Sequence, residues 1–262
     1  MTAKRAEWYE AAFGPFYPVL YRRRDDSEAD RVLESFGDLF RPGGRILDLA
    51  CGSGRYMVAA ARRGLEVWGV DLSDFLLGEA AGRGGLQGRL VRADMRRLPF
   101  QSSAFDAVLC MFTSFGYFSV DMDNLLVLHE VSRVTKTGGT FLLDFLNADH
   151  HATLRPSETE RESDDYMVSE RRSLESGAKF LVKHVRALNR KTGALLEYDE
   201  RVRLYTRGEL HTMLDSVDLG VSGVFGDYDR SEFDKDNSQR IILVCEKQSA
   251  AFDVTRTRPT RA

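Results

Sequence analysis

Short apolar runs alternate with helical stretches through the middle of the chain. The first run, RILDLA (45–50), ends in a glycine-rich turn, and the segment after it, RYMVAAARRG (55–64), repeats apolar residues at helical spacing. Four more strand signals follow, separated by helical segments: LEVWGVDLS (65–73), RLVRADM (89–95), FDAVLCMF (105–112) and TFLLDFL (140–146). This alternation predicts an α/β fold with a doubly wound, mostly parallel, Rossmann-like sheet.

The pattern changes after Asn147. The stretch HATLRPSETERESDD (151–165) is polar and loop-like, and the three segments beyond it alternate apolar with charged residues around Gly177 and Gly193. Such alternation with turn signals is typical of antiparallel strands. We therefore expect an antiparallel β insertion at 150–205 that caps the active site, set into a core domain made of 41–149 and 206–248.

The two ends of the chain differ from this core. Residues 1–40 are helical in pattern, rich in aromatic side chains and interrupted by prolines, and we expect them to form an N-terminal helical lid. Near the other end, TRGELHTMLDSV (206–217) predicts a helix and QRIILVCEK (239–247) a last strand. The polar tail at 249–262 predicts disorder.

Composition narrows the class of protein. A formal net charge of −3 gives no overall attraction for phosphate backbones, so we expect no nucleic-acid partner. The three cysteines are too scattered for a disulfide framework, and none has metal-ligand spacing with histidine. No segment approaches the roughly 20 apolar residues that span a bilayer. These features predict a cytoplasmic protein without a metal site or a membrane anchor.

The strongest local signal is ILDLACGSGRY (46–56). Gly52 and Gly54 allow the turn after the strand to bend tightly, so that a ligand can lie against backbone atoms. Three acids close consecutive strands, and in an open parallel sheet those carboxyl ends form the ligand site: Asp48, Asp71 and Asp94. Asp71 is suited to accept hydrogen bonds from ribose hydroxyls, and Asp94, with Met95 packing the ring, from an adenine amino group.

Other interpretations stay open at this point. A lone Gly-x-Gly turn can be purely structural, and each acid alone could cap a helix. A nicotinamide-dependent oxidoreductase uses a similar sheet. Its dinucleotide-binding motif, however, requires a third small residue where Met57 stands, and the chain lacks the Tyr-x-x-x-Lys pair of such enzymes. A module that binds the cofactor without catalysis is a third alternative.

Taken as a set, the glycine turn and the three acids resemble the class I S-adenosylmethionine-dependent methyltransferases over residues 43–146. The resemblance implies S-adenosylmethionine as cofactor, with Asp71 and Leu72 at the ribose and Asp94 and Met95 at the adenine. It also implies two further groups of contacts: Asp48, Ala50, Cys51, Gly52 and Gly54 along the methionine part, and Cys110, Met111 and Phe112 beside the sulfonium.

A narrower resemblance is carried by FYPVLYRRRDDSEAD (16–30), DMRRLPF (94–100), FDAVLCMFTSFGYF (105–118) and the inserted strands. These segments are similar to the N-methyltransferases that dimethylate amino groups of nucleotide-linked deoxysugars, and to related bacterial small-molecule enzymes. An N-terminal helix folds over the cofactor in that group, which implies that Tyr17, Tyr21 and Arg24 close on its methionine end. Ordinary aromatic packing is the alternative for the tyrosines.

The acceptor is expected to be an amine or hydroxyl of a small molecule. Methyl transfer requires a collinear arrangement in a dry pocket; an amine must be neutral, whereas a hydroxyl benefits from a general base. The candidate catalytic groups are His150, His151 and Tyr117, and the expected acceptor contacts are Phe115, Tyr117, Asn147, Arg203 and Tyr205. The inserted strands could either pair across a homodimer or roof the active site.

Overall fold

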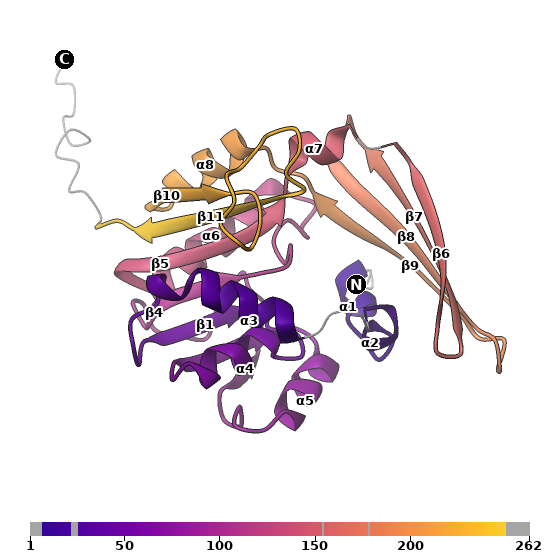
Figure 1. The fold of residues 1–262 in the computed structure, drawn as a ribbon, viewed down its shortest axis with the longest axis horizontal. Helices are drawn as coiled ribbons and strands as arrows, with labels where there is room; N and C mark the ends of the chain where they lie inside the picture. Colours follow the sequence, from indigo (N-terminus) through magenta and orange to yellow (C-terminus); the bar gives the residue numbers. More distant parts are fainter. Residues whose placement is uncertain (1–6, 22–25, 154, 178, 250–262) are drawn as a thin grey trace, which may run out of the picture.

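A seven-stranded sheet forms the centre of the computed structural model, which describes residues 7–21, 26–153, 155–177 and 179–249. The order of the described strands is β10-β11-β5-β4-β1-β2-β3 (Figure 1). Their bounds are β1 Arg45–Leu49, β2 Glu66–Asp71, β3 Leu90–Arg92, β4 Phe105–Cys110, β5 Thr135–Leu146, β10 Leu219–Phe225 and β11 Arg240–Lys247. Strands β1 to β5 run parallel, while β11 lies antiparallel between β5 and β10. The predicted mostly parallel, doubly wound sheet is confirmed.

Helices cover both faces of this sheet because successive strand residues point to opposite layers. Ile46 packs into the cluster that contains Val32 and Met57, whereas Leu47 packs into the cluster that contains Val131 and Leu214. The first layer is formed by α3 Asp26–Ser35, α4 Arg55–Arg62, α5 Asp74–Gly82 and the short turn η1 Gly37–Leu39, and the second by α6 Asp121–Val134 and α8 Arg207–Asp215. Side chains buried on both faces explain the near-continuous apolar runs of the parallel strands.

Four strands between β5 and α8 form a separate antiparallel sheet in the order β6-β7-β8-β9. The short helix α7 Ala148–Ala152 leads into it, and the strands are β6 Ser157–Ser163, β7 Tyr166–Glu175, β8 Phe180–Asn189 and β9 Leu195–Arg203. The first of these strands lies where the sequence predicted a loop. β6 is an edge strand whose side chains are largely exposed, so its polar composition carries no alternation, and it is held by backbone pairing with β7.

Strand β10 also lacks a sequence prediction. Its segment, LGVSGVF, has two glycines, and Leu219 is its one buried residue. It pairs antiparallel with β11 at the end of the sheet, with a register shift between Val221 and Gly223. An edge position with glycine-containing alternation gives a weak strand signal.

Two short helices, α1 Trp8–Ala12 and α2 Tyr17–Leu20, lie between the central sheet and the antiparallel sheet (Figure 1). Leu20 packs with Val168 and Val185 of the antiparallel sheet, and the Phe16 ring meets the Tyr166 ring edge-on at 5.6 Å between centroids. On the other side, α1 packs against the loop after β4 through aromatic contacts. The N-terminal helices therefore join the two sheets.

Candidate active site

A cavity of about 1250 Å³ lies at the carboxyl ends of β1 to β4. Its floor is made by the turns after these strands, its side by α1 and α2, and its roof by the inner face of β7 to β9. The site lies where the order of the sheet reverses between β1 and β4, as expected for open α/β sheets. The predicted residues that line it are Tyr17, Tyr21, Asp48, Ala50, Cys51, Gly52, Asp71, Leu72, Asp94, Met95, Met111, Phe112 and Tyr117.

The glycine turn after β1 uses its two predicted glycines differently. Gly52 has a φ of 54° and faces the cavity, where its N–H donates to Oδ2 of Asp71 at 2.8 Å. Gly54 has a φ of 77° and is not among the lining residues; a Cβ there would lie 3.2 Å from the Cβ of Ala80. Gly52 thus shapes the floor, and Gly54 allows α4 to start in contact with α5.

Asp71 ends β2 and connects the strand to the glycine turn. One carboxylate oxygen accepts from the Gly52 N–H and the other from the Ser73 N–H, each at 2.8 Å. Burial raises the pKa of Asp71, and the backbone N–H groups that bind its carboxylate oppose that rise. Since each carboxylate oxygen has a second lone pair, both can still accept from a ligand in the cavity.

Asp48 carries an unmatched oxygen at the floor of the cavity. Its side chain is 2% exposed, and Oδ2 has no hydrogen-bond partner among the described residues. Burial raises the pKa of Asp48 to about 8, while Arg55 nearby acts in the opposite direction. A buried carboxylate oxygen without a donor is suited to a ligand that brings a cation or a hydrogen-bond donor.

Arg55 lies in the first turn of α4, beside Asp48 in the cavity lining. Its guanidinium is 3.3 Å from the Glu28 carboxylate and 5.8 Å from the centroid of the Phe112 ring. Arginine is unfavourable in the first turn of a helix because the dipole there is positive. The placement of this cation next to an acid with an unmatched oxygen gives the floor both signs of charge.

Asp94 lines the cavity after β3, but its carboxylate is already occupied. Arg96 donates to it through Nε at 3.1 Å and Nη2 at 2.6 Å, and the Arg96 backbone N–H donates to Oδ1 at 2.9 Å. The same guanidinium reaches Asp123 at 3.0 Å and lies 4.2 Å from the Phe118 ring centroid. Asp94 therefore anchors this rim of the cavity through Arg96.

The turn after β4 is strained. Phe112 and Thr113 have φ values of 60° and 58°, a conformation that a β-branched residue such as threonine rarely adopts. Asp144 of β5 holds both residues, accepting from the Phe112 N–H through Oδ2 at 2.7 Å and from the Thr113 N–H through its backbone oxygen at 3.1 Å. Strain of this kind, about 1–3 kcal/mol per residue, persists only where the surroundings impose it.

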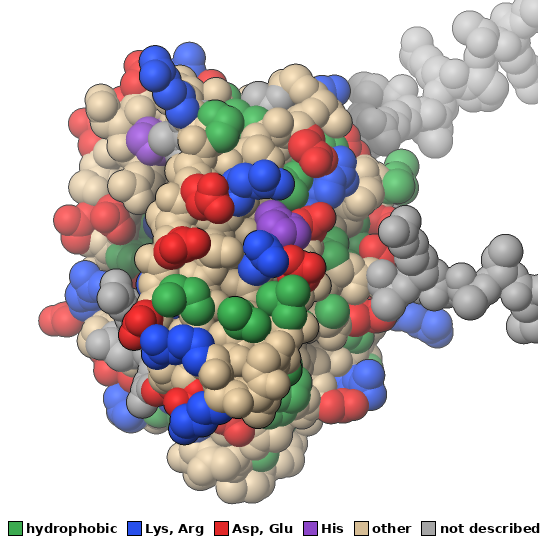
Figure 2. Space-filling view, turned by 90° about the vertical axis from the view of Figure 1, so that its right-hand side faces the viewer, with side chains coloured by type: hydrophobic (Ala, Val, Ile, Leu, Met, Phe, Trp, Pro, Cys, Tyr) green, Lys and Arg blue, Asp and Glu red, His purple; other side chains and the backbone are tan. Residues whose placement is uncertain are grey.

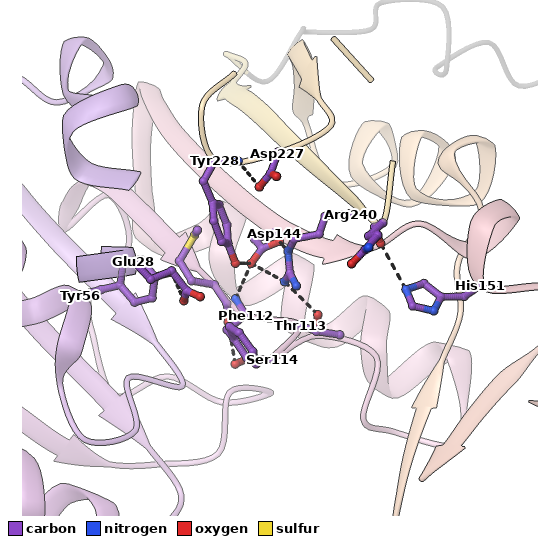
Figure 3. A network of polar contacts seen from close by, with 12 residues as sticks. Glu28, Tyr56, Phe112, Thr113, Ser114, Asp144, His151, Asp227, Tyr228 and Arg240 are labelled. Atoms are coloured by element: carbon purple, nitrogen blue, oxygen red, sulfur yellow. Dashed lines mark hydrogen bonds and ion pairs between the residues drawn. The ribbon is translucent and has the colours of Figure 1, made fainter. Parts of the chain in front are cut away.

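A buried polar network stands behind this turn (Figure 3). Arg240 of β11 donates to the two oxygens of Asp144 at 2.6 Å each, and to the Thr113 hydroxyl at 3.2 Å. The Tyr228 hydroxyl adds a further bond to Asp144 at 2.7 Å. Arg240 also lines the cavity, 5.2 Å from the Phe112 ring centroid. The network fixes the turn in its place beside the cavity.

The two candidate histidines do not line the cavity. His150 Nδ1 lies 2.9 Å from the backbone oxygen of Asp236, and His151 Nε2 lies 3.2 Å from that of Gln239. Burial lowers the pKa of His151 to about 4, with His150 acting in the same direction. Helix α7 turns both rings toward the 234–239 loop, so the structure gives neither histidine a position for the expected catalytic role.

Several other predicted residues also lie outside the cavity lining. Asn147 caps α7 and donates to backbone oxygens of Lys235 and Ser238 at 2.7 Å each. Arg203 binds Glu209 at 2.8 Å, and the Tyr205 hydroxyl binds Asp121 at 2.7 Å. The remaining two, Phe115 and Cys110, are each 1% exposed within the core. These side chains join the insertion and the sheet to the core instead of facing an acceptor.

The structure places two of the three N-terminal candidates. Tyr17 and Tyr21 line the cavity with their ring centroids 4.7 Å apart, whereas Arg24 lies outside the described residues. Tyr117 also lines the cavity, in contact with the Trp8 ring at 4.9 Å between centroids. Trp8 Nε1 is a second buried polar atom without a partner among the described residues. The aromatic wall therefore carries a donor that the sequence did not indicate.

The charged lining residues without a sequence prediction include Arg55, Arg240, Lys183 and Glu200. The signal for Arg55 was its unfavourable place at a helix start, directly after the glycine turn. Lys183 and Glu200 sit on β8 and β9 at the same register position, and their side chains form an ion pair at 2.6 Å. In the sequence they lie in segments that alternate apolar with charged residues, as the solvent-facing side chains of a half-buried strand do.

The described residues contain no group of three or more histidine, cysteine, aspartate or glutamate side chains arranged to hold a metal ion. Among these residues there is also no helix of the length and apolarity that crossing a bilayer requires.

Part of the chain matches known methyltransferase sequences. A sequence model described as a methyltransferase domain matches residues 46–139. The chain is 33% identical over 124 residues to a Bacillus subtilis protein named as a methyltransferase, and 34% identical over 114 residues to demethylmenaquinone methyltransferase of Staphylococcus aureus. These matches cover 47% and 42% of this chain, and 50% and 45% of those proteins. The chain thus spans about half the length of the curated relatives it matches.

Solved structures extend the likeness to the whole fold. An S-adenosylmethionine-dependent methyltransferase from Clostridium acetobutylicum superimposes with a TM-score of 0.76 at 20% identity, covering 89% of this chain and 96% of that one. A sugar N-methyltransferase from a Streptoalloteichus species gives 0.70 at 19% identity, over 95% and 99%. An amino pentose methyltransferase from Micromonospora echinaspora gives 0.63 at 20%, over 94% and 99%. Residues 46–139 therefore match a methyltransferase domain, and the chain as a whole has the fold of these S-adenosylmethionine-dependent methyltransferase structures.

Proposed function

We propose that the protein transfers a methyl group from S-adenosylmethionine to an amine of a small molecule. The observation that carries the proposal is the unmatched Oδ2 of Asp48, which lines the same cavity as Asp71 and Asp94. These three acids come from the ends of consecutive parallel strands. With the strained turn after β4 beside them, they form one continuous floor for an extended ligand.

The residues of this floor fit the cofactor. Asp48 Oδ2 would accept from its ammonium group, and Arg55 would bind its carboxylate. Asp71 would accept from the ribose hydroxyls with its remaining lone pairs, while Met95 and the rim anchored by Asp94 would border the adenine. When bound, the cofactor supplies a methyl group on a positively charged sulfur.

The contribution of the chain is orientation and exclusion of water. In-line displacement needs no nucleophilic side chain, because most of the acceleration comes from holding the reacting atoms collinear in a dry site. The fixed turn at Phe112 and Thr113 and the aromatic side chains of Trp8 and Tyr117 line the space beside the floor. A cavity of about 1250 Å³ exceeds what one small ligand usually occupies, so an acceptor can enter with the cofactor.

Two observations favour an amine over a hydroxyl acceptor. Among the described residues that line the cavity there is no histidine, the side chain that most often serves as general base. Two of the similar structures are described as a sugar N-methyltransferase and an amino pentose methyltransferase. An amine requires only that its nitrogen be neutral when it attacks.

Titration calorimetry tests the cofactor half of the proposal. The protein is titrated in turn with S-adenosylmethionine, S-adenosylhomocysteine and NAD. We expect micromolar or tighter binding of the first two and none of NAD. Binding of NAD alone would support an oxidoreductase and end the proposal.

Mass spectrometry tests the transfer half. A metabolite extract of bacterial cells is incubated with the protein and with S-adenosylmethionine labelled in its methyl group. A labelled small molecule in which the new methyl group is on nitrogen is the expected product. Tight cofactor binding without any labelled product would instead favour a module that binds the cofactor without catalysis.

A further inference from the structure

Three side chains form a hydrogen-bonded cluster on the roof of the cavity. Lys183 Nζ lies 2.6 Å from Oε2 of Glu200, and it also donates to the Tyr21 hydroxyl oxygen. The Tyr21 hydroxyl donates in turn to Oε1 of Glu200. All three residues line the cavity, although they come from β8, β9 and the end of α2. We call them the roof cluster.

The roof cluster is costly to build. Lys183 is 9% exposed, and burial lowers the pKa of its ammonium group while Glu200 opposes that shift. A buried ion pair is often no more stabilising than apolar residues of the same volume. A charged pair kept at the wall of a ligand cavity is therefore a candidate for a role in the reaction.

The charged neighbours of the cluster are engaged with one another. Glu170 of β7 binds Arg161 at 3.1 Å and Arg172 at 2.7 Å, and the Arg161 guanidinium also donates to the Leu20 backbone oxygen at 2.6 Å. The Tyr198 hydroxyl of β9 lies 3.5 Å from Oε1 of Glu200. The titratable and charged groups around Glu200 are thus Tyr17 and Tyr21 from α2, Arg161 from β6, Glu170 and Arg172 from β7, Lys183 from β8 and Tyr198 from β9.

The position of Glu200 separates it from the other acids of the cavity. Asp48, Asp71 and Asp94 belong to the floor, at the strand ends where the cofactor fits. The remaining lining carboxylates are on α1 and α5: Glu10, Asp74 and Glu79. Within the described lining, Glu200 is the carboxylate that the antiparallel roof contributes, opposite the floor and next to the space left for an acceptor.

We propose that Glu200 is the group that accepts the proton from the acceptor amine, and that Tyr21 and Lys183 position its carboxylate. This inference rests on the proposed function. An acceptor bound as R–NH3+ transfers one proton to Glu200, which leaves neutral R–NH2 with a free electron pair. That pair forms the N–CH3 bond as the C–S bond breaks, and the electrons of the C–S bond remain on sulfur. The product leaves the step as R–NH2+–CH3.

The test compares two substitutions at one position. The acceptor is the compound labelled by the wild-type protein in the extract experiment, purified and used at known concentration. E200Q keeps the size of the side chain but cannot take the proton, and we expect kcat at pH 7 to fall about 100-fold or more. E200D keeps a carboxylate and should recover part of that loss.

The pH profile separates a chemical role from a structural one. In E200Q the reaction must use amine that is already neutral in solution, so kcat/KM should rise roughly tenfold per pH unit up to the pKa of the acceptor amine. The wild-type protein should show a shallower rise over the same range. Equal profiles for E200Q and wild type, or a wild-type rate in E200Q, would overturn the proposal.

A matched control comes from the opposite face of the same strand. Glu197 of β9 is exposed and pairs with exposed Arg186 on the outer surface of the antiparallel sheet, where side chains of both charges are mixed (Figure 2). E197Q should keep wild-type kcat at every pH. Calorimetry with S-adenosylmethionine accompanies each variant, and unchanged affinity in E200Q is expected. A wild-type protein that binds the cofactor but labels nothing counts against the proposed function and, with it, against this inference.

Discussion

Gly69 and Met57 meet where β2 packs under α4, and the absence of a side chain on the glycine makes room for the methionine sulfur. A Cβ on Gly69 would lie 2.3 Å from Sδ of Met57 and 2.8 Å from Sγ of Cys51. Both distances are well below van der Waals contact. The glycine turn of the cofactor site therefore rests on a layer in which one position cannot carry even a methyl group.

Gly69→Ala should destabilise the fold by about 1–3 kcal/mol, because the added methyl group overpacks a full core. Urea unfolding measures the difference. Gly208→Ala is the control: nothing lies within 4 Å of the Cβ it would add, and it lies in α8, so a gain of roughly 0.5–1 kcal/mol is expected. Equal unfolding midpoints for the two variants would contradict the packing argument.

Asp144→Asn should cost about 3–5 kcal/mol of unfolding free energy, since it leaves the Arg240 guanidinium without its paired charge in the interior. Glu162→Gln, which breaks the exposed pair with Arg190, should change stability by less than about 1 kcal/mol. Chemical denaturation of both variants at neutral pH makes the comparison. A small loss in Asp144→Asn would mean that the network does not hold the strained turn.

Asp48→Asn should stabilise the protein without ligand, and increasingly so as the pH rises. The pKa of Asp48 is raised from 3.8 to about 8 on folding, so the folded state holds a proton that the unfolded state releases. Stability from this group is complete below pH 4 and is lost as the pH rises toward 8. Unfolding midpoints of wild type and variant at pH 5 and pH 8 test this, and an equal difference at both values would refute it.

Asp71→Ala should weaken S-adenosylmethionine binding by about 1–3 kcal/mol, the cost of leaving buried hydroxyl groups without an acceptor. Calorimetry gives the affinity, and thermal unfolding checks that the glycine turn still forms. Asp30→Ala serves as the control. Asp30 is on α3 and pairs with Arg62 and Arg63 at the surface, so this variant should bind S-adenosylmethionine with wild-type affinity. Unchanged affinity in Asp71→Ala would place the ribose elsewhere.

The sequence was informative about the central sheet and the floor because both depend on short-range patterns. A strand, a glycine turn and a helix lie next to one another in the chain, and parallel strands end at one edge. Asp48, Asp71 and Asp94 therefore reach one cavity, as their spacing indicated. The resemblance to methyltransferases followed from the same residues, and the comparisons match residues 46–139 to a methyltransferase domain and the chain to the methyltransferase fold.

The residues of the roof could not be predicted from the sequence, for a physical reason. Lys183 and Glu200 meet through antiparallel register between β8 and β9, and alternation alone does not fix which face of a strand lies toward water. A charge that faces a cavity has the same pattern as one that faces solvent. Residues close to the mouth in sequence, such as His150 and Asn147, lie outside the cavity lining because the start of α7 directs them toward the 234–239 loop.

The floor proposed for the donor and the roof proposed for the acceptor come from different stretches of the chain. The strand ends that form the floor all precede residue 147, whereas the roof strands run from Ser157 to Arg203 and pair only with one another in their own sheet. Mutations or a designed graft can thus change the roof hairpins without changing the strand ends that would bind the methyl donor. The same fold can in this way change its substrate while the floor of the cavity stays the same.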